Sequence, residues 1–385
     1  MVHPVYADMP TTIFEEMSGL AREYGAINLG QGFPDAPGPP ALLRAAAEAV
    51  LQGSNQYPPS SGLPALREAA AAHYNRNQGL ELGPEQIVVT SGATEALAAA
   101  LLALVGPGDE VAMFQPLYDA YLPLVRRAGG TARLASLTPP LWRITPRVLD
   151  AAFGPNTRLV ILNNPMNPTG RSFDDEELGL LAEYCLRHDA IAICDEVWEA
   201  VVPPPGTFRP LIGFRGMAER TIKIGSAGKM FGVTGWKIGL MAASPALART
   251  MARAHQFLTF TTPPNLQTAV AHGLTKMPEW FDEMPAAMGR SRRRLAAGLT
   301  AAGFAVLPSQ ATYFLTVDLT ASGIALDDRA FALRAVKDHG VASIPVSALY
   351  AENPATNILR LCFAKADDTL DLAVERLAAA RAAVV

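Results

Sequence analysis

The chain has 385 residues, of which 50% are hydrophobic and 18% are charged. This length predicts two or three domains, and this composition excludes a disordered or low-complexity protein. Lysine and arginine total 32 against 36 acidic residues, so the net charge is −4 with histidine neutral. That balance offers no basic footprint for nucleic acid or for an anionic membrane surface.

The cysteines and the apolar runs of the sequence indicate the cellular compartment. Three cysteines are an odd number, and they lack CxxC spacing, which predicts a reduced environment. The first ten residues lack the apolar region of a signal peptide, and no stretch long enough to span a bilayer is continuously apolar. The six histidines are scattered without metal-ligand spacing. We therefore expect a soluble cytoplasmic protein without a metal site.

Short, continuously apolar runs predict strands that are covered on both faces. They lie at residues 87–90, 110–114, 158–162, 190–194, 221–225 and 237–242. Helical patterns at 94–104, 118–128 and 174–187 lie between them, and Ser172 is the expected N-cap of the last. Alternation of strands and helices at this spacing predicts a mostly parallel α/β sheet.

The sequence pattern changes after Pro285. The remaining candidate elements are helical patterns at 290–299 and 327–339, apolar runs at 311–318, 341–345 and 357–364, and an alanine-rich final helix. We expect residues 41–284 to form a large domain, and residues 1–40 with 285–385 to form a smaller α+β domain. A ligand site is expected where the carboxyl ends of the large sheet's strands meet the small domain.

The glycine-rich segment 225–235 contains Lys229 among small and apolar neighbours. Desolvation disfavours a charged ammonium, so a buried lysine here would be a neutral amine and a nucleophile. Taken alone, the segment fits a solvated lysine in a turn equally well. A phosphate-binding P-loop is excluded because Lys223 and Met230 stand where glycine and serine or threonine are needed. The Ser226-x-x-Lys229 spacing of serine acylases lacks its companion S-D-N and K-T-G strings.

Three other segments place polar groups at strand ends. Asp195 follows the apolar run 190–194, and a buried carboxylate there needs a cationic partner such as a protonated ring nitrogen; an ordinary turn acid is the alternative. Asn167 begins the second of two Asn-Pro steps, at residues 164–165 and 167–168, which cannot continue a helix. Residues 91–94 open a helix directly after a strand, and free backbone N–H groups at such a position bind phosphate.

Together these segments resemble the fold-type I, pyridoxal 5′-phosphate-dependent aminotransferases of class I/II. The resemblance is strongest to the branch with kynurenine–oxoglutarate, glutamine and methionine aminotransferases. It runs through nearly the whole chain, at residues 28–35, 55–57, 91–96, 164–170, 195–197, 225–229, 234–237 and 359–361. It implies a large domain with a mostly parallel sheet between helices, and a smaller α+β domain.

The resemblance also implies a role for each matching residue. Lys229 would form a Schiff base with the cofactor and then shuttle the substrate's proton, while Asp195 would pair with the pyridine nitrogen. Arg360 would clamp the substrate α-carboxylate bidentately. The other implied contacts are Asn167 with the phenolic oxygen, Tyr118 with the ring face, Gly32 with the carboxylate, and Gly92, Ala93, Thr94, Ser226 and Lys237 with the phosphate.

Two positions extend or depart from the family pattern. Tyr57 matches a residue that reaches the partner subunit's cofactor phosphate, which implies a homodimer with shared sites. Trp198 stands where the family usually has a tyrosine that bonds the phenolic oxygen. Because an indole N–H donates but does not accept, either Trp198 donates in a changed geometry or Asn167 alone serves this oxygen.

The implied reaction is ping-pong transfer of an α-amino group to a 2-oxo acid. The expected side-chain pocket is formed by Phe14, Tyr118, Phe260 and Thr261, which are aromatic or neutral. We therefore expect an uncharged donor: methionine, glutamine or an aromatic amino acid. A cysteine-conjugate or cystathionine β-lyase is the alternative on the same chemistry. A non-catalytic regulatory module on this scaffold is disfavoured, because only about 40 residues precede the large domain.

Overall fold

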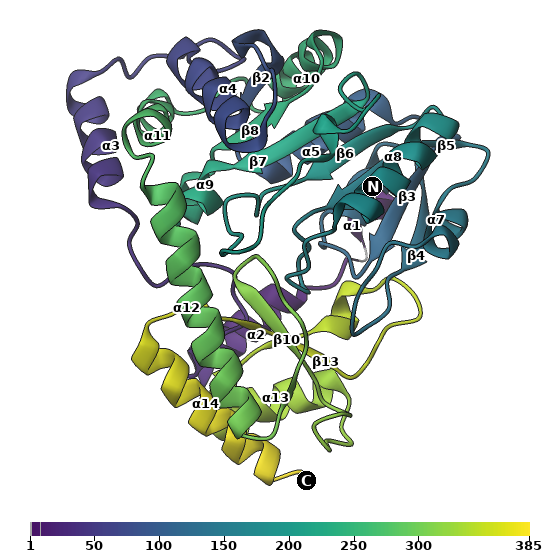
Figure 1. The fold of residues 1–385 in the computed structure, drawn as a ribbon, viewed down its shortest axis with the longest axis vertical. Coiled ribbons are helices and arrows are strands. Elements are labelled where there is room, and N and C mark those ends of the chain that lie inside the picture. Colours follow the sequence, from purple (N-terminus) through teal and green to yellow (C-terminus); the bar gives the residue numbers. More distant parts are fainter. Residues whose placement is uncertain (1, 8) are drawn as a thin grey trace.

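The computed structural model describes residues 2–7 and 9–385. Its largest element is a seven-stranded sheet in the order β2-β8-β7-β6-β5-β3-β4 (Figure 1). β8 runs antiparallel to β2 and β7, and the other neighbouring strands are parallel, which confirms the mostly parallel sheet. The strands are β2 (Ile87–Thr90), β3 (Glu110–Gln115), β4 (Thr131–Ser136), β5 (Thr157–Asn163), β6 (Ile191–Asp195), β7 (Thr221–Ser226) and β8 (Gly239–Ala242).

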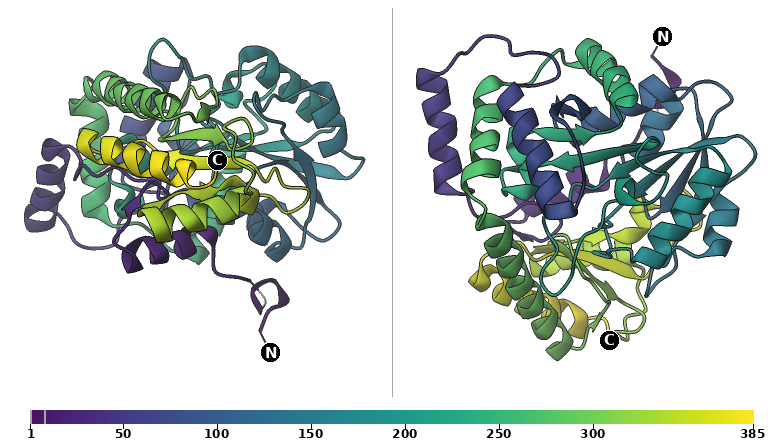
Figure 2. Two further views of the ribbon diagram at one scale, coloured as in Figure 1. Left: turned by 90° about the horizontal axis from the view of Figure 1, so that it is seen from below. Right: turned by 45° about the horizontal axis from the view of Figure 1, so that its top comes forward.

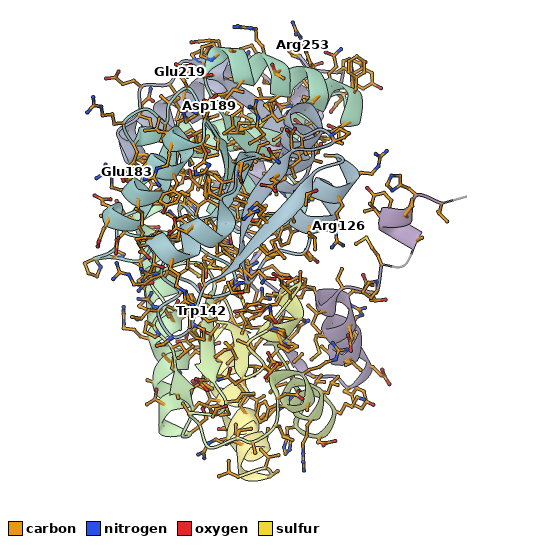
Figure 3. All side chains as sticks on the ribbon, turned by 90° about the vertical axis from the view of Figure 1, so that its right-hand side faces the viewer. Arg126, Trp142, Glu183, Asp189, Glu219 and Arg253 are labelled. Carbon is orange, nitrogen blue, oxygen red and sulfur yellow. The ribbon has the colours of Figure 1, made fainter. Side chains whose placement is uncertain are left out.

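Helices cover both faces of this sheet, which explains why its strands are continuously apolar. In β6, for example, Ile193 packs into one core while Ala192 and Cys194 pack into another. The side chains fill the space between ribbons, with Trp142 completely buried and Arg126 exposed (Figure 3). The covering helices are α4 (Pro64–Gln78), α5 (Ala93–Leu104), α6 (Tyr121–Arg127), α7 (Pro146–Ala152), α8 (Asp175–Arg187), α10 (Pro245–Leu258) and α11 (Pro264–Lys276). The helix α3 (Pro40–Gln52) packs against α11.

A second core lies around a four-stranded antiparallel sheet in the order β12-β13-β10-β9. Its strands are β9 (Ala305–Val306), β10 (Phe314–Asp318), β12 (Ile344–Pro345) and β13 (Ile358–Cys362). It packs with α2 (Ile13–Glu23), α13 (Asp328–His339) and α14 (Asp367–Ala382), and β1 (Ile27–Asn28) pairs in parallel with β11 (Val341–Ala342). The N-terminal segment therefore shares a core with the C-terminal one, although they are far apart in sequence.

The helix α12 (Trp280–Ala301) runs from the large sheet's layer into this second core (Figure 1). The expected domain limit between residues 284 and 285 falls inside this continuous helix, and the exact limits stay a prediction. The short helix α1 (Pro4–Ala7) projects at the N-terminal end of the chain and lies next to α6 (Figure 2). Among the described residues, no helix combines the length and the apolar character needed to cross a membrane.

Two local expectations need correction, and one strand was not expected. The N-cap of α8 is Asp174, not Ser172, because Asp174 and Glu177 form a capping box with reciprocal bonds of 3.0 and 3.1 Å. The helix expected from residue 118 begins at Tyr121, which leaves Tyr118 in the preceding turn. The edge strand β4 was not expected, because its half-exposed residues do not form an apolar run.

Candidate active site

A cavity of about 440 Å³ lies at the carboxyl ends of the central strands, against β10 and β13 of the small sheet. This is the place that the sequence predicted for a ligand. Its wall includes most of the predicted residues: Phe14, Gly32, Gly92, Ala93, Thr94, Tyr118, Asn167, Asp195, Trp198, Ser226, Lys229, Lys237 and Arg360. Segments separated by more than a hundred residues thus contribute to one site.

Lys229 lies in the short helix α9 (Ala227–Met230), directly after β7. Ser226 is the N-cap, and its hydroxyl accepts from the Lys229 amide at 3.3 Å. The Lys229 ammonium Nζ donates to the Gly32 carbonyl at 3.0 Å and lies 4.6 Å from the centre of the Trp198 ring. Burial lowers the pKa of Lys229 to about 8, so a neutral, nucleophilic amine is accessible near neutral pH.

Asp195 ends β6 and is buried in the cavity wall. Its Oδ2 accepts a hydrogen bond from the Tyr121 hydroxyl, while its Oδ1 is buried without a partner. Burial raises the pKa of this carboxyl to about 6, partly offset by Tyr121. A half-paired buried carboxylate is costly unless a bound group supplies a cation or a donor.

The start of α5, together with Ser226 and Lys237, forms a candidate binding site for an anion, here called the anion seat. Gly92 has a φ of +80°, and a Cβ there would lie 3.1 Å from the Lys237 ammonium. The backbone N–H groups of the first turn of α5, together with Lys237 and Ser226, border the same part of the wall. Helix N-termini and lysines bind phosphate through aligned N–H dipoles and charge.

Arg360 on β13 is completely enclosed, yet it lines the cavity. Its Nη1 donates to Asn167 Oδ1 at 2.9 Å, its Nη2 donates to the Gly30 carbonyl, and its Nε has no partner. Burial lowers the pKa of this guanidinium to about 9, so it is still protonated at neutral pH. A buried guanidinium with unused donor capacity fits an incoming carboxylate.

These groups fit pyridoxal 5′-phosphate. The amine of Lys229 suits its aldehyde, the unpartnered oxygen of Asp195 suits a protonated ring nitrogen, and the α5 seat suits its phosphate. A family model for aminotransferase class I and II matches residues 24–377. The chain belongs to the class I and II aminotransferases.

Curated relatives agree with this family. The probable N-succinyldiaminopimelate aminotransferase of Mycobacterium tuberculosis is 43% identical over 381 residues, covering 95% of each chain. The methionine aminotransferase of Escherichia coli is 39% identical, again covering 95% of each chain. The solved structure of the N-succinyldiaminopimelate aminotransferase from M. tuberculosis matches with a TM-score of 0.95 at 42% identity, over 99% of this chain and 100% of that one.

Membership confirms the fold and the enzyme class expected from the sequence. The protein is a pyridoxal 5′-phosphate-dependent aminotransferase whose substrates are an amino acid and a 2-oxo acid. The alternative of a non-catalytic regulatory module is therefore wrong. The relatives carry different substrate names, so they leave the donor open.

Tyr57, Phe260 and Thr261, three predicted residues of this aminotransferase, lie outside the cavity wall of the single chain. Tyr57 is 81% exposed and Phe260 46% exposed, and their rings pack edge to face at 5.2 Å. The Thr261 hydroxyl is buried without a partner. Phe260 and Thr261 were expected in the side-chain pocket, and one chain alone does not place them there. Tyr57 was expected to reach the partner subunit's site, which stays a prediction.

Sequence reasoning missed several residues of the site. Tyr121 does not line the cavity but supports Asp195 by a hydrogen bond, and its only signal in the sequence is its position three residues after Tyr118. Asn163 accepts from the Asn167 amide at 2.7 Å and donates to the Asp195 carbonyl at 2.9 Å, which ties two strand ends together. Asp119 lines the cavity and brings an acidic group that the motifs did not indicate.

A second layer holds the anion seat in place. Glu95 accepts from the Ser91 amide at 3.1 Å and lies 2.9 Å from His255 Nδ1. His255 is fully enclosed, and its Nε2 donates to the Ser60 carbonyl at 2.9 Å. These contacts anchor the loop before α5, so His255 supports the site without lining it.

Proposed function

We propose that Lys229 holds the cofactor covalently through Nζ and moves the proton of the substrate α-carbon. The observation that carries this proposal is that Lys229 and the half-paired Asp195 line one buried cavity. When bound, the cofactor supplies an electron sink for negative charge at the α-carbon. The lowered pKa of Lys229, about 8, lets its amine take up and release a proton near neutral pH.

Other residues in and around the cavity wall would bind and orient the cofactor and the substrate. Asp195 would keep the ring nitrogen protonated, and Tyr121 would keep Asp195 ionised. Arg360 would bind the α-carboxylate, next to Gly32, where a Cβ would collide with the Phe314 ring at 2.5 Å. Asn167 and Trp198 would contact the phenolic oxygen of the cofactor, and Tyr118 would stack on the face of its ring. The cofactor phosphate would be bound by Gly92, Ala93, Thr94, Ser226 and Lys237.

We propose that the active unit is a homodimer with shared sites. Two large aromatic side chains, Tyr57 and Phe260, are exposed together on one chain, as at an interface. Thr261 follows Phe260 in the chain and is half-buried beside this pair of rings. Light scattering coupled to gel filtration tests this proposal; a monomer with full activity would contradict it.

The charges of the cavity favour an uncharged donor, such as methionine, glutamine or an aromatic amino acid. Among the described residues, the cations of the wall are Lys229, Lys237 and Arg360, and each has a proposed role. No cation therefore remains for a second substrate carboxylate. Asp119 adds a negative charge to the wall, which disfavours donors with acidic side chains.

A second candidate donor is N-succinyldiaminopimelate, which the M. tuberculosis relative favours by its name. That compound carries carboxylates beyond the one that Arg360 would bind. A residue of the partner subunit would have to supply the missing charge. The two candidates thus differ in the charge that the far end of the pocket must provide.

The deciding experiment compares kcat/KM for methionine, glutamine, phenylalanine, aspartate and N-succinyldiaminopimelate with one 2-oxo acid acceptor. We expect an uncharged donor to exceed aspartate by about tenfold or more. Preference for N-succinyldiaminopimelate would establish the second candidate, and preference for aspartate would refute the charge argument. Pyruvate release from cystathionine without any acceptor would instead reveal the lyase alternative.

A further inference from the structure

Outside the cavity wall lies a charged cluster, the Lys223 cluster, formed by the buried residues Lys223, Glu196, Glu199 and Tyr74 and the half-buried Gln78. Lys223 Nζ donates to Glu196 Oε2 at 2.7 Å and also to Glu199 Oε2. Gln78 donates to Glu199 Oε2 at 2.6 Å, and the Tyr74 hydroxyl donates to Glu199 Oε1 at 3.2 Å. Lys223 has no exposed surface, and no member of the cluster lines the cavity.

The cluster holds the two ends of one tight turn. Glu196 and Glu199 flank Val197 and Trp198, and the Glu199 amide donates to the Glu196 carbonyl at 3.0 Å. The Glu196 amide donates to the Ile224 carbonyl of β7 at 2.9 Å. Lys223 lies on the same strand, so a single ammonium ties both carboxylates of the turn to β7.

This turn places the Trp198 ring next to Lys229. The Trp198 ring centre lies 4.6 Å from Lys229 Nζ, and a π-face at this distance stabilises a protonated nitrogen. The cluster also abuts the strand that leads to Lys229: a Cβ at Gly225 would lie 2.3 Å from the Tyr74 hydroxyl and 2.4 Å from Glu199 Oε1. The turn and the lysine are thus held by the same buried contacts.

The charges of the cluster make Lys223 hard to replace. Two carboxylates surround one ammonium, and the nearby carboxylates raise the pKa of Lys223 despite its burial. Burial raises the pKa of Glu196 to about 7. Without Lys223, Glu196 and Glu199 would face each other in a dry interior and share a proton, because two unpaired buried carboxylates cannot both stay ionised.

We propose that Lys223 is a positioning residue of this aminotransferase: by holding Glu196 and Glu199, it fixes Trp198 against Lys229 and so sets the proton affinity of the lysine nitrogen. This inference rests on the proposed role of Lys229. It assigns Lys223 no contact with substrate or cofactor. Its effect passes through the geometry of one turn.

The test is a spectrophotometric pH titration of the lysine–cofactor linkage in purified holoenzyme. We expect Lys223→Met to retain cofactor and to lower the titration midpoint by about half a pH unit or more, because the Trp198 ring no longer faces the nitrogen. The titratable and charged groups facing Lys229 are Asp195, Arg360, Lys237 and Cys362, and the variant leaves them all in place.

Two further variants separate positioning from simple stability. Lys223→Met/Glu199→Gln removes one charge of each sign, and we expect it to recover part of the midpoint shift. In a Trp198→Phe background, Lys223→Met should cause a smaller further shift than in the natural chain, because the two residues act through the same contact. If Lys223→Met does not fold, Glu199→Gln, which weakens the same tie, replaces it in the single-variant titration and in the Trp198→Phe background.

A variant that melts at a lower temperature but titrates as the natural enzyme does would overturn the proposal, since the cluster would then only stabilise the fold. The proposed function fails separately: it is refuted if the natural chain shows no titrating cofactor absorbance at all. In that case the Lys223 proposal falls with it.

Discussion

The Tyr121 hydroxyl donates a hydrogen bond to one carboxylate oxygen of Asp195, while the other oxygen has no partner. Asp195 is thereby oriented by the chain on one side and left available on the other. The same division appears in Arg360, whose Nη atoms bind Asn167 and Gly30 while Nε stays free. Both charged groups are held in place before any ligand arrives, which is the arrangement expected of a preorganised site.

Replacing Tyr121 by phenylalanine should weaken the cofactor's hold. Hydrogen-bond donation favours the ionised carboxylate, so its loss should raise the pKa of Asp195 further. We expect kcat to fall by about tenfold and the cofactor Kd to rise, as for a lost bond to a charged group. Tyr184→Phe is the matched control, because that hydroxyl donates to Asp150 at 2.5 Å outside the cavity wall. Equal losses in both variants would contradict this prediction.

Asp195→Asn should stabilise the cofactor-free chain while it impairs the enzyme. Burial raises the pKa of Asp195 from 3.8 to about 6, so the folded state binds more protons than the unfolded state between these values. Stability is then lost as the pH rises through this window, by roughly 3 kcal/mol at most for a difference of about two pH units.

We therefore expect the variant's free energy of unfolding, measured with urea, to exceed that of the natural chain at pH 8 but not at pH 4. Its affinity for the cofactor should fall at both values. A variant that is less stable at pH 8 would show that the Tyr121 hydrogen bond outweighs the cost of burying the charge.

Asp119→Asn should change substrate selectivity more than rate. The Asp119 carboxylate lines the cavity, and removing its charge lessens the repulsion of donors with acidic side chains. We expect the ratio of kcat/KM for aspartate to that for methionine to rise by about threefold to tenfold at pH 8. Asp175→Asn, which alters an exposed pair with Arg209, serves as the control. An unchanged ratio would show that Asp119 does not contact the donor side chain.

Trp198→Phe should lower the rate without abolishing cofactor binding. Phenylalanine keeps an aromatic face near Lys229 but loses the indole N–H and part of the packing against Tyr313 and Phe314. Stopped assays combined with absorbance of the bound cofactor measure both quantities. Complete loss of bound cofactor would mean that Trp198 is essential for holding it.

Much of the fold was predictable because its strands are buried on both sides and therefore read as apolar runs. The strand β4 was missed for the opposite reason: it lies at the sheet edge, and its residues are half exposed. The N-cap of α8 was misplaced because two polar candidates lay close together and only the reciprocal bonds of Asp174 and Glu177 distinguish them.

Glycines and strand ends made Lys229 and Asp195 candidates in the sequence, and the family resemblance implied their roles. Tyr121 and Lys223 could not be named as contributors to the site. The partner of Tyr121 lies 74 residues away in sequence, and those of Lys223 lie 27 and 24 residues away, so only the folded chain brings them together.

The most direct test of the account is to find which residue carries the cofactor. Purified enzyme is loaded with pyridoxal 5′-phosphate, reduced with borohydride and digested, and the masses of its peptides are measured by mass spectrometry. We predict a phosphopyridoxyl group on Lys229, with Lys223 and Lys237 unmodified. A label on another lysine, or none after loading, would contradict the central claim.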